Sequence, residues 1–242
     1  MMRKYLINTT KRVATFFGNA IQETQWFGKL RENDSTRWYY PWDGRGFLQL
    51  TLATNYIKYW DFRGRASQIS ADTRNRLKAA EVHANQDHAH AIQYFADTVS
   101  GVTPVMLAWR ENLCPTASAD ATFSEENKLC AADSAGFYWA MMRMARYADT
   151  PMVLERRTVM ATAPSTPNHA ASQNHPVIKT YYHSNNFRDA SASVNYPVSV
   201  GNPSISFNGD VDRCIPFAQS LAVVGQVWFP SENGLIDFPE GR

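Results

Sequence analysis

Residues 21–33 read IQETQWFGKLREN, and residues 44–56 read GRGFLQLTLATNY. The first segment carries two glutamates nine positions apart, Glu23 and Glu32. The second segment opens with a Gly-Arg-Gly turn and continues into a polar run at Gln49, Thr51, Asn55 and Tyr56. Two carboxylates followed by a tight turn and a polar platform suit acid/base cleavage of a glycosidic bond.

Apolar side chains recur at helical spacing before the first glutamate. This pattern predicts a helix over residues 9–30, capped by Thr9 or Thr10. Glu23 falls at the edge of the apolar face of that helix, between its core side and its solvent side. A carboxyl group that apolar neighbours half-shield holds its proton more readily than an exposed one, as an acid catalyst requires. From position alone, an ordinary glutamate at a helix boundary is the alternative interpretation.

The segment that follows, residues 31–43, has neither helical nor strand periodicity, so we expect a loop. Its aromatic residues are Trp38, Tyr39, Tyr40 and Trp42. On a loop these rings form either a wall for stacking sugar rings, with Trp38 and Tyr39 as candidate contacts, or the hydrophobic underside of a packed loop. The glycines on both sides of Arg45 indicate tight backbone and close approach to another segment.

The composition indicates a folded chain with a substantial core. Of the 242 residues, 44% are hydrophobic and 19% are charged, a balance that excludes a disordered chain. This length fits one large domain or two small ones. A net charge of +2 without a Lys/Arg block argues against nucleic acid as a partner. No segment approaches the ~18 consecutive apolar residues that a membrane span needs.

Cysteine and histidine spacing indicates no metal site. The three cysteines lack CxxC spacing, which argues against structural zinc. They are Cys114, Cys130 and Cys214, and three free thiols are favoured over a bridge between the first two. His83 and His90 share one face of a predicted helix and His88 lies on another, so solvated or capping histidines are favoured over metal ligands. We therefore predict neither a metal nor a cofactor.

The remaining pattern is mostly helical and indicates a single domain over residues 1–242. Residues 160–176 are rich in Pro, Ser and Asn and predict a long surface loop. We expect Pro216 to be tolerated only in the first turn of its helix. Helices are expected over residues 72–99, 103–112, 124–149, 177–195 and 210–224, a loop over 196–209 and an extended tail over 227–242.

With these motifs in hand, the chain resembles the family 19 glycoside hydrolases, a lysozyme-like group of chitinases and phage-type endolysins. The matching segments are Gln22-Glu23-Thr24, Arg31-Glu32-Asn33, residues 44–51, Asn55-Tyr56, residues 134–139 and residues 212–217. In the family these correspond to a His-Glu-Thr or His-Glu-Ser helix motif, a loop glutamate, the GRGxIQLT…NY signature, a SAGWFW-like segment and the closing helix. The matches span nearly the whole chain.

The resemblance implies a role for each matching residue. Glu23 would be the general acid, Glu32 the general base, and Thr51 a holder of the attacking water. Arg45 would brace the site by pairing with a carboxylate. The substrate contacts would be Gln49, Asn55, Tyr56, Asn195 and Arg213. The family inverts the anomeric centre, which requires carboxyl groups ~6.5–9.5 Å apart so that water fits between them.

The chain also departs from the family pattern. Gln22 replaces the histidine that precedes the acid, which removes a titratable neighbour. Asn195 precedes Tyr-Pro where the family has Asn-Gly-Gly. Residues 61–130 match no diagnostic motif and are candidates for substrate choice or partner binding.

We therefore predict a mostly α, lysozyme-like, two-lobed domain with a substrate cleft. The expected function is hydrolysis of β-1,4 bonds between amino sugars, in peptidoglycan rather than chitin, because the loops and disulfides of plant-type chitinases are missing. A chitinase is the first alternative, and an inactive module that binds cell walls is the second. A metal-dependent hydrolase that uses the three histidines is a third.

The expected location of action is the periplasm or cell wall of a target cell. The first residues, MMRKYLINTTKR, contain no apolar segment or cleavage site, so the sequence predicts no signal peptide. The chain resembles lysozyme-like toxin modules of interbacterial effectors, which implies a secretion-system route or membership of a larger protein. The expected partners are peptidoglycan glycan strands, with a cognate immunity protein or delivery apparatus as further candidates.

Overall fold

The computed structural model describes residues 1–114, 125–162, 176–225 and 228–240. Helix accounts for 54% of the structure and strand for 10%, so the predicted mostly α class is confirmed. The chain divides into two compact units, which are described separately. The first unit contains residues 1–5 and 23–141, and the second contains residues 6–22 and 142–242.

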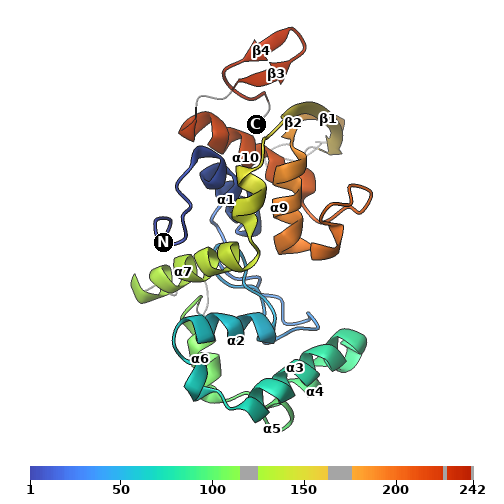
Figure 1. The fold of residues 1–242 in the computed structure, drawn as a ribbon. Helices are drawn as coiled ribbons and strands as arrows, with labels where there is room; N and C mark the ends of the chain where they lie inside the picture. The colour runs from blue at the N-terminus through green and yellow to red at the C-terminus, as the bar shows by residue number, and fades with distance from the viewer. Residues whose placement is uncertain (115–124, 163–175, 226–227, 241–242) are drawn as a thin grey trace, which may run out of the picture. The chain divides into compact units, whose positions relative to one another are not determined.

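Figure 1 labels the helices and strands of both units. The first unit contains α2 (Ala53–Phe62), η1 (Ala66–Gln68), α3 (Ala71–Gln86), η2 (His88–His90), α4 (Ala91–Tyr94), α5 (Asp97–Ser100), α6 (Pro104–Glu111) and α7 (Glu125–Met141). The second contains α1 (Thr10–Glu23) up to Gln22, α8 (Met144–Asp149), β1 (Glu155–Thr162), β2 (Pro176–His183), α9 (Asn185–Asn195), η3 (Pro197–Ser199), α10 (Asp210–Val224), β3 (Phe229–Ser231) and β4 (Gly234–Ile236). In the described residues, no helix has the length and hydropathy needed to cross a bilayer.

Aromatic rings build the core of the first unit. Trp42, Tyr56 and Trp60 are fully buried, and their ring centroids lie 5.5–5.8 Å apart. The predicted aromatic loop therefore has two sides, because Trp42 belongs to the core while Trp38 and Tyr39 keep part of their surface exposed. The packed underside is thus confirmed for Trp42, while the sugar-stacking role of Trp38 and Tyr39 stays a prediction.

The long helix expected over residues 72–99 is wrong, because α3 ends at Gln86 and short helical turns follow. Asp87 leaves the helical conformation, with φ −133° and ψ 77°. Its carboxylate accepts hydrogen bonds from the His90 ring (Nδ1, 2.9 Å) and the Tyr94 hydroxyl (3.0 Å). A short carboxylate side chain that binds nearby groups in this way competes with the helical backbone pattern.

The next two predicted helices are present with altered bounds. As predicted, α6 begins at Pro104, and the Thr103 hydroxyl accepts a hydrogen bond from the Met106 amide at 3.4 Å. The helix expected over 124–149 is interrupted at Arg143, which has φ 52° and separates α7 from α8. The cysteines are all free, as favoured from their spacing.

In the second unit, the prediction of a helix over residues 177–195 is wrong for its first part and confirmed for its second part, α9. Its first part is strand β2, which pairs antiparallel with β1 from Glu155↔His183 to Thr162↔Pro176. The run from 177 to 182, VIKTYY, is rich in β-branched and aromatic residues, which favour a strand over a helix. Most of the predicted surface loop, residues 163–175, lies outside the described residues.

The final predicted helix is confirmed as α10, although Pro216 lies well beyond its first turn, so that part of the prediction was wrong. The helix is held by close packing in the core of the second unit. The rings of Phe187 and Phe217 stack with centroids 3.9 Å apart. A side chain at Gly18 would collide with both residues, since its Cβ would lie 2.8 Å from the ring of Phe187 and 2.8 Å from Cβ of Phe217.

Candidate active site

Glu23 is the last residue of α1, which is shorter than predicted. Three consecutive non-glycine residues, 25–27, have left-handed backbone conformations with φ of 49–61° and end the helix. Thr24 fixes this turn, because its buried hydroxyl accepts a hydrogen bond from the Phe27 amide at 2.9 Å. Such strained backbone persists only where surrounding contacts enforce it, and it is common at functional sites.

The end of α1 places Glu23 near α7. Glu23 is the C-terminal residue of α1. Its side chain is half-buried, and its charge is felt by Tyr138 of α7. Burial and, next, the Glu23 carboxylate raise the pKa of the Tyr138 hydroxyl above its ordinary value.

Glu32 lies on a short extended segment that pairs with the glycine turn. Its amide donates to the Gly44 carbonyl at 2.9 Å, and Arg31 pairs with Arg45 as an antiparallel bridge. Arg45 in turn forms a bridge with Leu50. The two motifs of the sequence are therefore joined by backbone hydrogen bonds, as the tight glycine turn led us to expect.

The Glu32 carboxylate is surrounded by donors. Oε1 accepts from the Tyr39 hydroxyl at 2.6 Å and pairs with Arg37 Nε at 3.2 Å. Oε2 accepts from the Gly44 amide at 3.3 Å. Burial and the hydrogen bond to Glu32 raise the pKa of Tyr39, so the tyrosine stays a neutral donor. These three donors hold both oxygens of the Glu32 carboxyl group in a fixed position, and a general base must be positioned in this way to reach its proton.

Gly44 brings Thr51 to the same turn. A Cβ placed on Gly44 would lie 3.1 Å from Thr51 Oγ1 and 2.8 Å from Gln49 Oε1, so only glycine fits without displacement. The Thr51 hydroxyl donates to the Gln49 carbonyl at 2.6 Å. Its oxygen lone pairs can therefore accept from a water, while Glu32 on the amide side of Gly44 can take a proton from it.

Arg45 is fully buried and organises the support of this turn. It pairs with Asp43 (3.4 Å) and Glu111 (3.1 Å) and donates to the carbonyl of Cys114. The predicted pairing of Arg45 with a carboxylate is thus present. Arg31 Nε lies 2.6 Å from the same Asp43, whose side chain is also fully buried.

The other predicted residues of the first unit support the turn more than they line an open surface. Gln49 has φ 48° and donates from Nε2 to the Gly46 carbonyl at 2.9 Å. Asn55 donates from Nδ2 to the Thr51 carbonyl at 2.9 Å. Tyr56 is fully buried, and its hydroxyl donates to the Asp43 carbonyl at 2.8 Å.

Asn195 and Arg213 lie in the second unit. Asn195 is the last residue of α9 and is half-buried. Arg213 is buried at 2% exposure, and its Nη1 donates to Asn19 Oδ1 at 3.0 Å. This contact joins α10 to α1, and the substrate roles of both residues stay predictions.

Sequence reasoning missed Asp43 and its third arginine partner, Arg110, in this network. Arg110 Nη1 lies 4.0 Å from Asp43 Oδ1, and Arg110 also pairs with Glu111 at 2.7 Å. Asp43 directly precedes the Gly-Arg-Gly turn, so an acidic residue beside a buried arginine was the available signal. Arg110 and Glu111 gave no signal, because only the fold brings α6 to the turn.

Each of the three clustered histidines has a separate environment. The His83 ring stacks on Tyr94 (5.5 Å), the His88 ring stacks on Trp38 (5.7 Å), and His90 contacts Asp87. Within the described residues, no group of three potential ligands is arranged to hold a metal.

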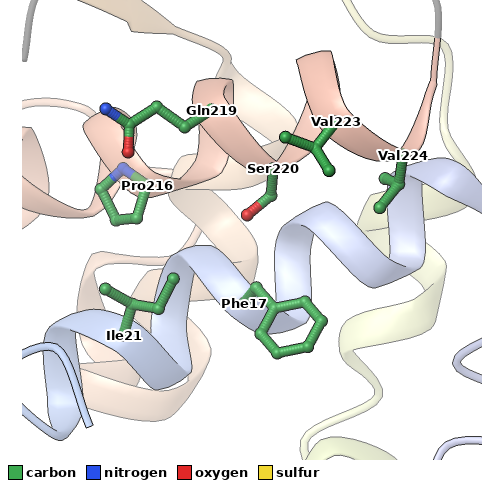
Figure 2. Close-up of a pocket in the computed structure, with 7 residues that line it drawn as sticks. All are labelled: Phe17, Ile21, Pro216, Gln219, Ser220, Val223 and Val224. Carbon is green, nitrogen blue, oxygen red and sulfur yellow. The ribbon is translucent and has the colours of Figure 1, made fainter.

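A separate hollow lies in the second unit between α1 and α10, as Figure 2 shows. Its volume is about 260 Å³, and it contains none of the candidate residues. It is lined by Phe17, Ile21, Pro216, Gln219, Ser220, Val223 and Val224. The lining is almost wholly apolar and offers no acid or base, so this hollow is not a catalytic site.

Comparison of the chain with protein-family models, with curated proteins and with solved structures finds no match.

Proposed function

We propose that this protein is a lysozyme-like glycoside hydrolase that cleaves β-1,4 bonds between the amino sugars of peptidoglycan. One observation carries the proposal: Glu32 and Thr51 both lie against Gly44, whose amide donates to Glu32 Oε2 at 3.3 Å and whose missing side chain leaves room for Thr51 Oγ1. The resemblance to family 19 glycoside hydrolases supplies the reaction type, and with it the two-lobed cleft. The lack of any disulfide among the three cysteines favours a bacterial or phage type of enzyme over a plant-type chitinase.

The proposed reaction is a single inverting displacement. Glu23 donates its proton to the glycosidic oxygen as the bond to the anomeric carbon breaks. Water held by the Thr51 hydroxyl attacks that carbon from the opposite face, and Glu32 takes the proton that the water loses. The products are a chain with a new reducing end and a chain with a free hydroxyl. Proton exchange with solvent restores both glutamates.

The site of action would be the wall of a target cell, reached by a secretion-system route or as a module of a larger effector. This part of the proposal rests on the sequence resemblance to antibacterial toxin modules. A cognate immunity protein would then be the partner that protects the producing cell. Expression directed to the periplasm should lyse the host, whereas cytoplasmic expression should not.

The decisive experiment is digestion of purified sacculi by wild type, Glu32→Gln and Glu23→Gln. Each variant should lower the rate of new reducing ends by ~10²–10⁴-fold, because each removes one acid/base group. The matched control is Glu125→Gln, which changes a glutamate that is 82% exposed on α7. Mass spectrometry of the products identifies which sugar carries the reducing end.

The same experiment separates the alternatives. Release of soluble products from chitin but not from sacculi would identify a chitinase. Equal binding to sacculi by wild type and both variants, with no new reducing ends from any of them, would identify an inactive wall-binding module. Full activity in excess chelator would exclude a metal-dependent hydrolase.

A further inference from the structure

The segment formed by α3 and η2 contacts the candidate site at two points. This segment belongs to residues 61–130, where the sequence carries no motif for catalysis. In Figure 1, α3 lies beside α2, and the two helices pack against each other. One contact is made with the residues that follow Thr51, and the other with the loop that follows Glu32.

The first contact fixes the start of α2. Leu52 stands at the cap position with φ 77° and gives no capping hydrogen bond from its side chain. The cap comes instead from Glu81 of α3, which accepts from the Thr54 amide and from the Thr54 hydroxyl, each at 2.9 Å. Thr51 lies three residues before Thr54, so Glu81 fixes the backbone close to the Thr51 hydroxyl.

The second contact fixes the loop that carries Glu32. The ring of His88 lies parallel to Trp38, with 4° between their planes and 5.7 Å between centroids. Trp38 packs edge-on against Tyr39 at 5.3 Å, and the Tyr39 hydroxyl is the 2.6 Å donor to Glu32. A row of three rings therefore ends at the carboxylate.

The position of His88 is itself held by neighbours. Directly before it, Asp87 accepts from His90 and Tyr94. Tyr94 also stacks on His83 of α3, at 5.5 Å between ring centroids. These contacts fold η2 and α4 back on α3, so the His88 ring is presented by a braced turn.

We propose that α3 and η2 form a brace for catalysis, in which His88 and Glu81 are positioning residues for Glu32 and Thr51. His88 acts through the stacked rings of Trp38 and Tyr39, and Glu81 acts through the start of α2. The inference deepens the proposed function and rests on it for the catalytic roles of Glu32 and Thr51. Whether α3 and η2 hold Glu32 and Thr51 in position can be tested without any substrate.

The activity test compares His88→Ala, His88→Phe and Val82→Ala on purified sacculi. Loss of the His88 ring should lower kcat about tenfold with KM within about twofold, because a displaced base slows chemistry more than it weakens binding. His88→Phe keeps a flat ring and should restore most of kcat. Val82→Ala is the control, since it shortens a side chain of α3 that is 49% exposed and contributes no ring to the stack. Loss of kcat in Val82→Ala equal to that in His88→Ala, or no rescue by phenylalanine, would overturn the assignment.

A second readout is independent of activity. The Gly44 amide donates to Glu32 Oε2, so its chemical shift in ¹H–¹⁵N NMR spectra reports the position of the carboxylate. His88→Ala should move this resonance, while Val82→Ala and His88→Phe should leave it near its wild-type position. An unchanged Gly44 resonance in His88→Ala would refute the brace whatever the enzyme cleaves. If wild type cleaves neither sacculi nor chitin, the proposed function fails, and the resonance still decides the brace.

Glu81 is tested by a removal and rescue pair. Glu81→Ala removes both acceptors and should lower kcat about tenfold, as well as shifting the Thr51 amide resonance. Glu81→Gln should rescue both effects, since its oxygen accepts from the Thr54 amide and its NH2 group can donate to the Thr54 hydroxyl. Asp72→Asn on the exposed start of α3 is the control, because its carboxylate is 70% exposed and pairs only with Arg76 among the described ion pairs. Wild-type kcat in Glu81→Ala would refute its role.

Discussion

Each unit is built around a buried arginine, but the two arginines have different partners. Arg45 of the first unit is fully buried and pairs with the carboxylates of Asp43 and Glu111. Arg188 of the second unit is 4% exposed and donates mainly to backbone carbonyls, from 2.6 to 3.0 Å away. Those carbonyls belong to Ser199, Asn202 and Ile205.

The different partners indicate different roles for the Arg45 network and the Arg188 network. Carbonyl groups neutralise a guanidinium with fixed dipoles, so Arg188 fastens the loop after α9 mainly through the backbone, and its ion pairs with Asp189 (3.3 Å) and Asp210 (3.9 Å) are longer than its shortest bond to a carbonyl. The Arg45 network holds several full charges in a buried place, an arrangement that costs desolvation energy and is sensitive to every member. Such a network is expected beside a site where charge matters to the reaction.

The largest expected effects come from replacing each arginine with methionine. Arg45→Met should cost about 3–5 kcal/mol in unfolding free energy, because it leaves buried carboxylates short of a partner, and should abolish cleavage of sacculi. Arg188→Met should cost about 2–4 kcal/mol, through carbonyls left without donors. Urea unfolding measures both losses, and activity is then compared per folded molecule.

The comparison of the two arginines depends on the activity of Arg188→Met. Arg188→Met should keep activity per folded molecule within about threefold of wild type. A loss as large as that of Arg45→Met would show that the second unit takes part in the reaction. It would also favour the predicted substrate roles of Asn195 and Arg213.

A smaller effect is expected from neutralising one acidic partner in each unit. Asp43→Asn leaves Arg31 and Arg45 without a fully buried carboxylate and should cost about 3 kcal/mol together with most of the activity. Asp189→Asn changes a carboxylate that is 25% exposed beside Arg188 and should cost under about 1 kcal/mol. Equal losses in the two variants would contradict the distinction between the networks.

The smallest expected effect concerns pH. The histidines of the described part of the first unit are exposed, whereas His183 of the second unit is buried at 5% exposure. Burial lowers the pKa of His183 below its ordinary value of 6.5, with the Arg157 charge as the next cause. The unfolded chain therefore binds a proton at His183 more readily than the folded chain does. The contribution of His183 to the free energy of unfolding is present in full above pH 6.5 and is lost as the pH falls below that value.

Replacing His183 with glutamine should flatten this decline. Unfolding free energies measured between pH 5.5 and 7.5 should show a shallower slope for His183→Gln than for wild type. His83→Gln, which changes an exposed histidine of the first unit, should keep the wild-type slope. An equal slope in wild type and His183→Gln would show that burial of His183 has no thermodynamic consequence.

The fold was predictable where a single pattern dominated. The helices at Pro104 and Asp210 followed from caps and apolar spacing, and the mostly α class followed from their number. Predictions failed where a side chain interrupted a good pattern, as Asp87 does after α3. They also failed at β2, where strand-forming residues lead directly into a helix and apolar spacing alone cannot separate the two.

The candidate site was predictable as a set of motifs and only partly as a geometry. The sequence placed Glu23 on a helix and Glu32 on a loop, and both placements are correct. It could not show that Tyr39 donates to Glu32 or that Gly44 separates Glu32 from Thr51, because both depend on how two segments pair. The contribution of α3 and η2 could not be predicted from the sequence, because Glu81 and His88 contact residues that are distant along the chain, Thr54 and Trp38.

The capping of α2 by Glu81 has a consequence for folding. A helix whose N-terminal amides are capped by its own residues can form and open alone. In α2 the capping acceptor is instead Glu81, which belongs to α3. The Thr54 amide should therefore exchange with deuterium only when the two helices separate, so that α2 and α3 open as one cooperative unit. Order in the proposed catalytic turn would then be a property of the helix pair, gained and lost in a single step.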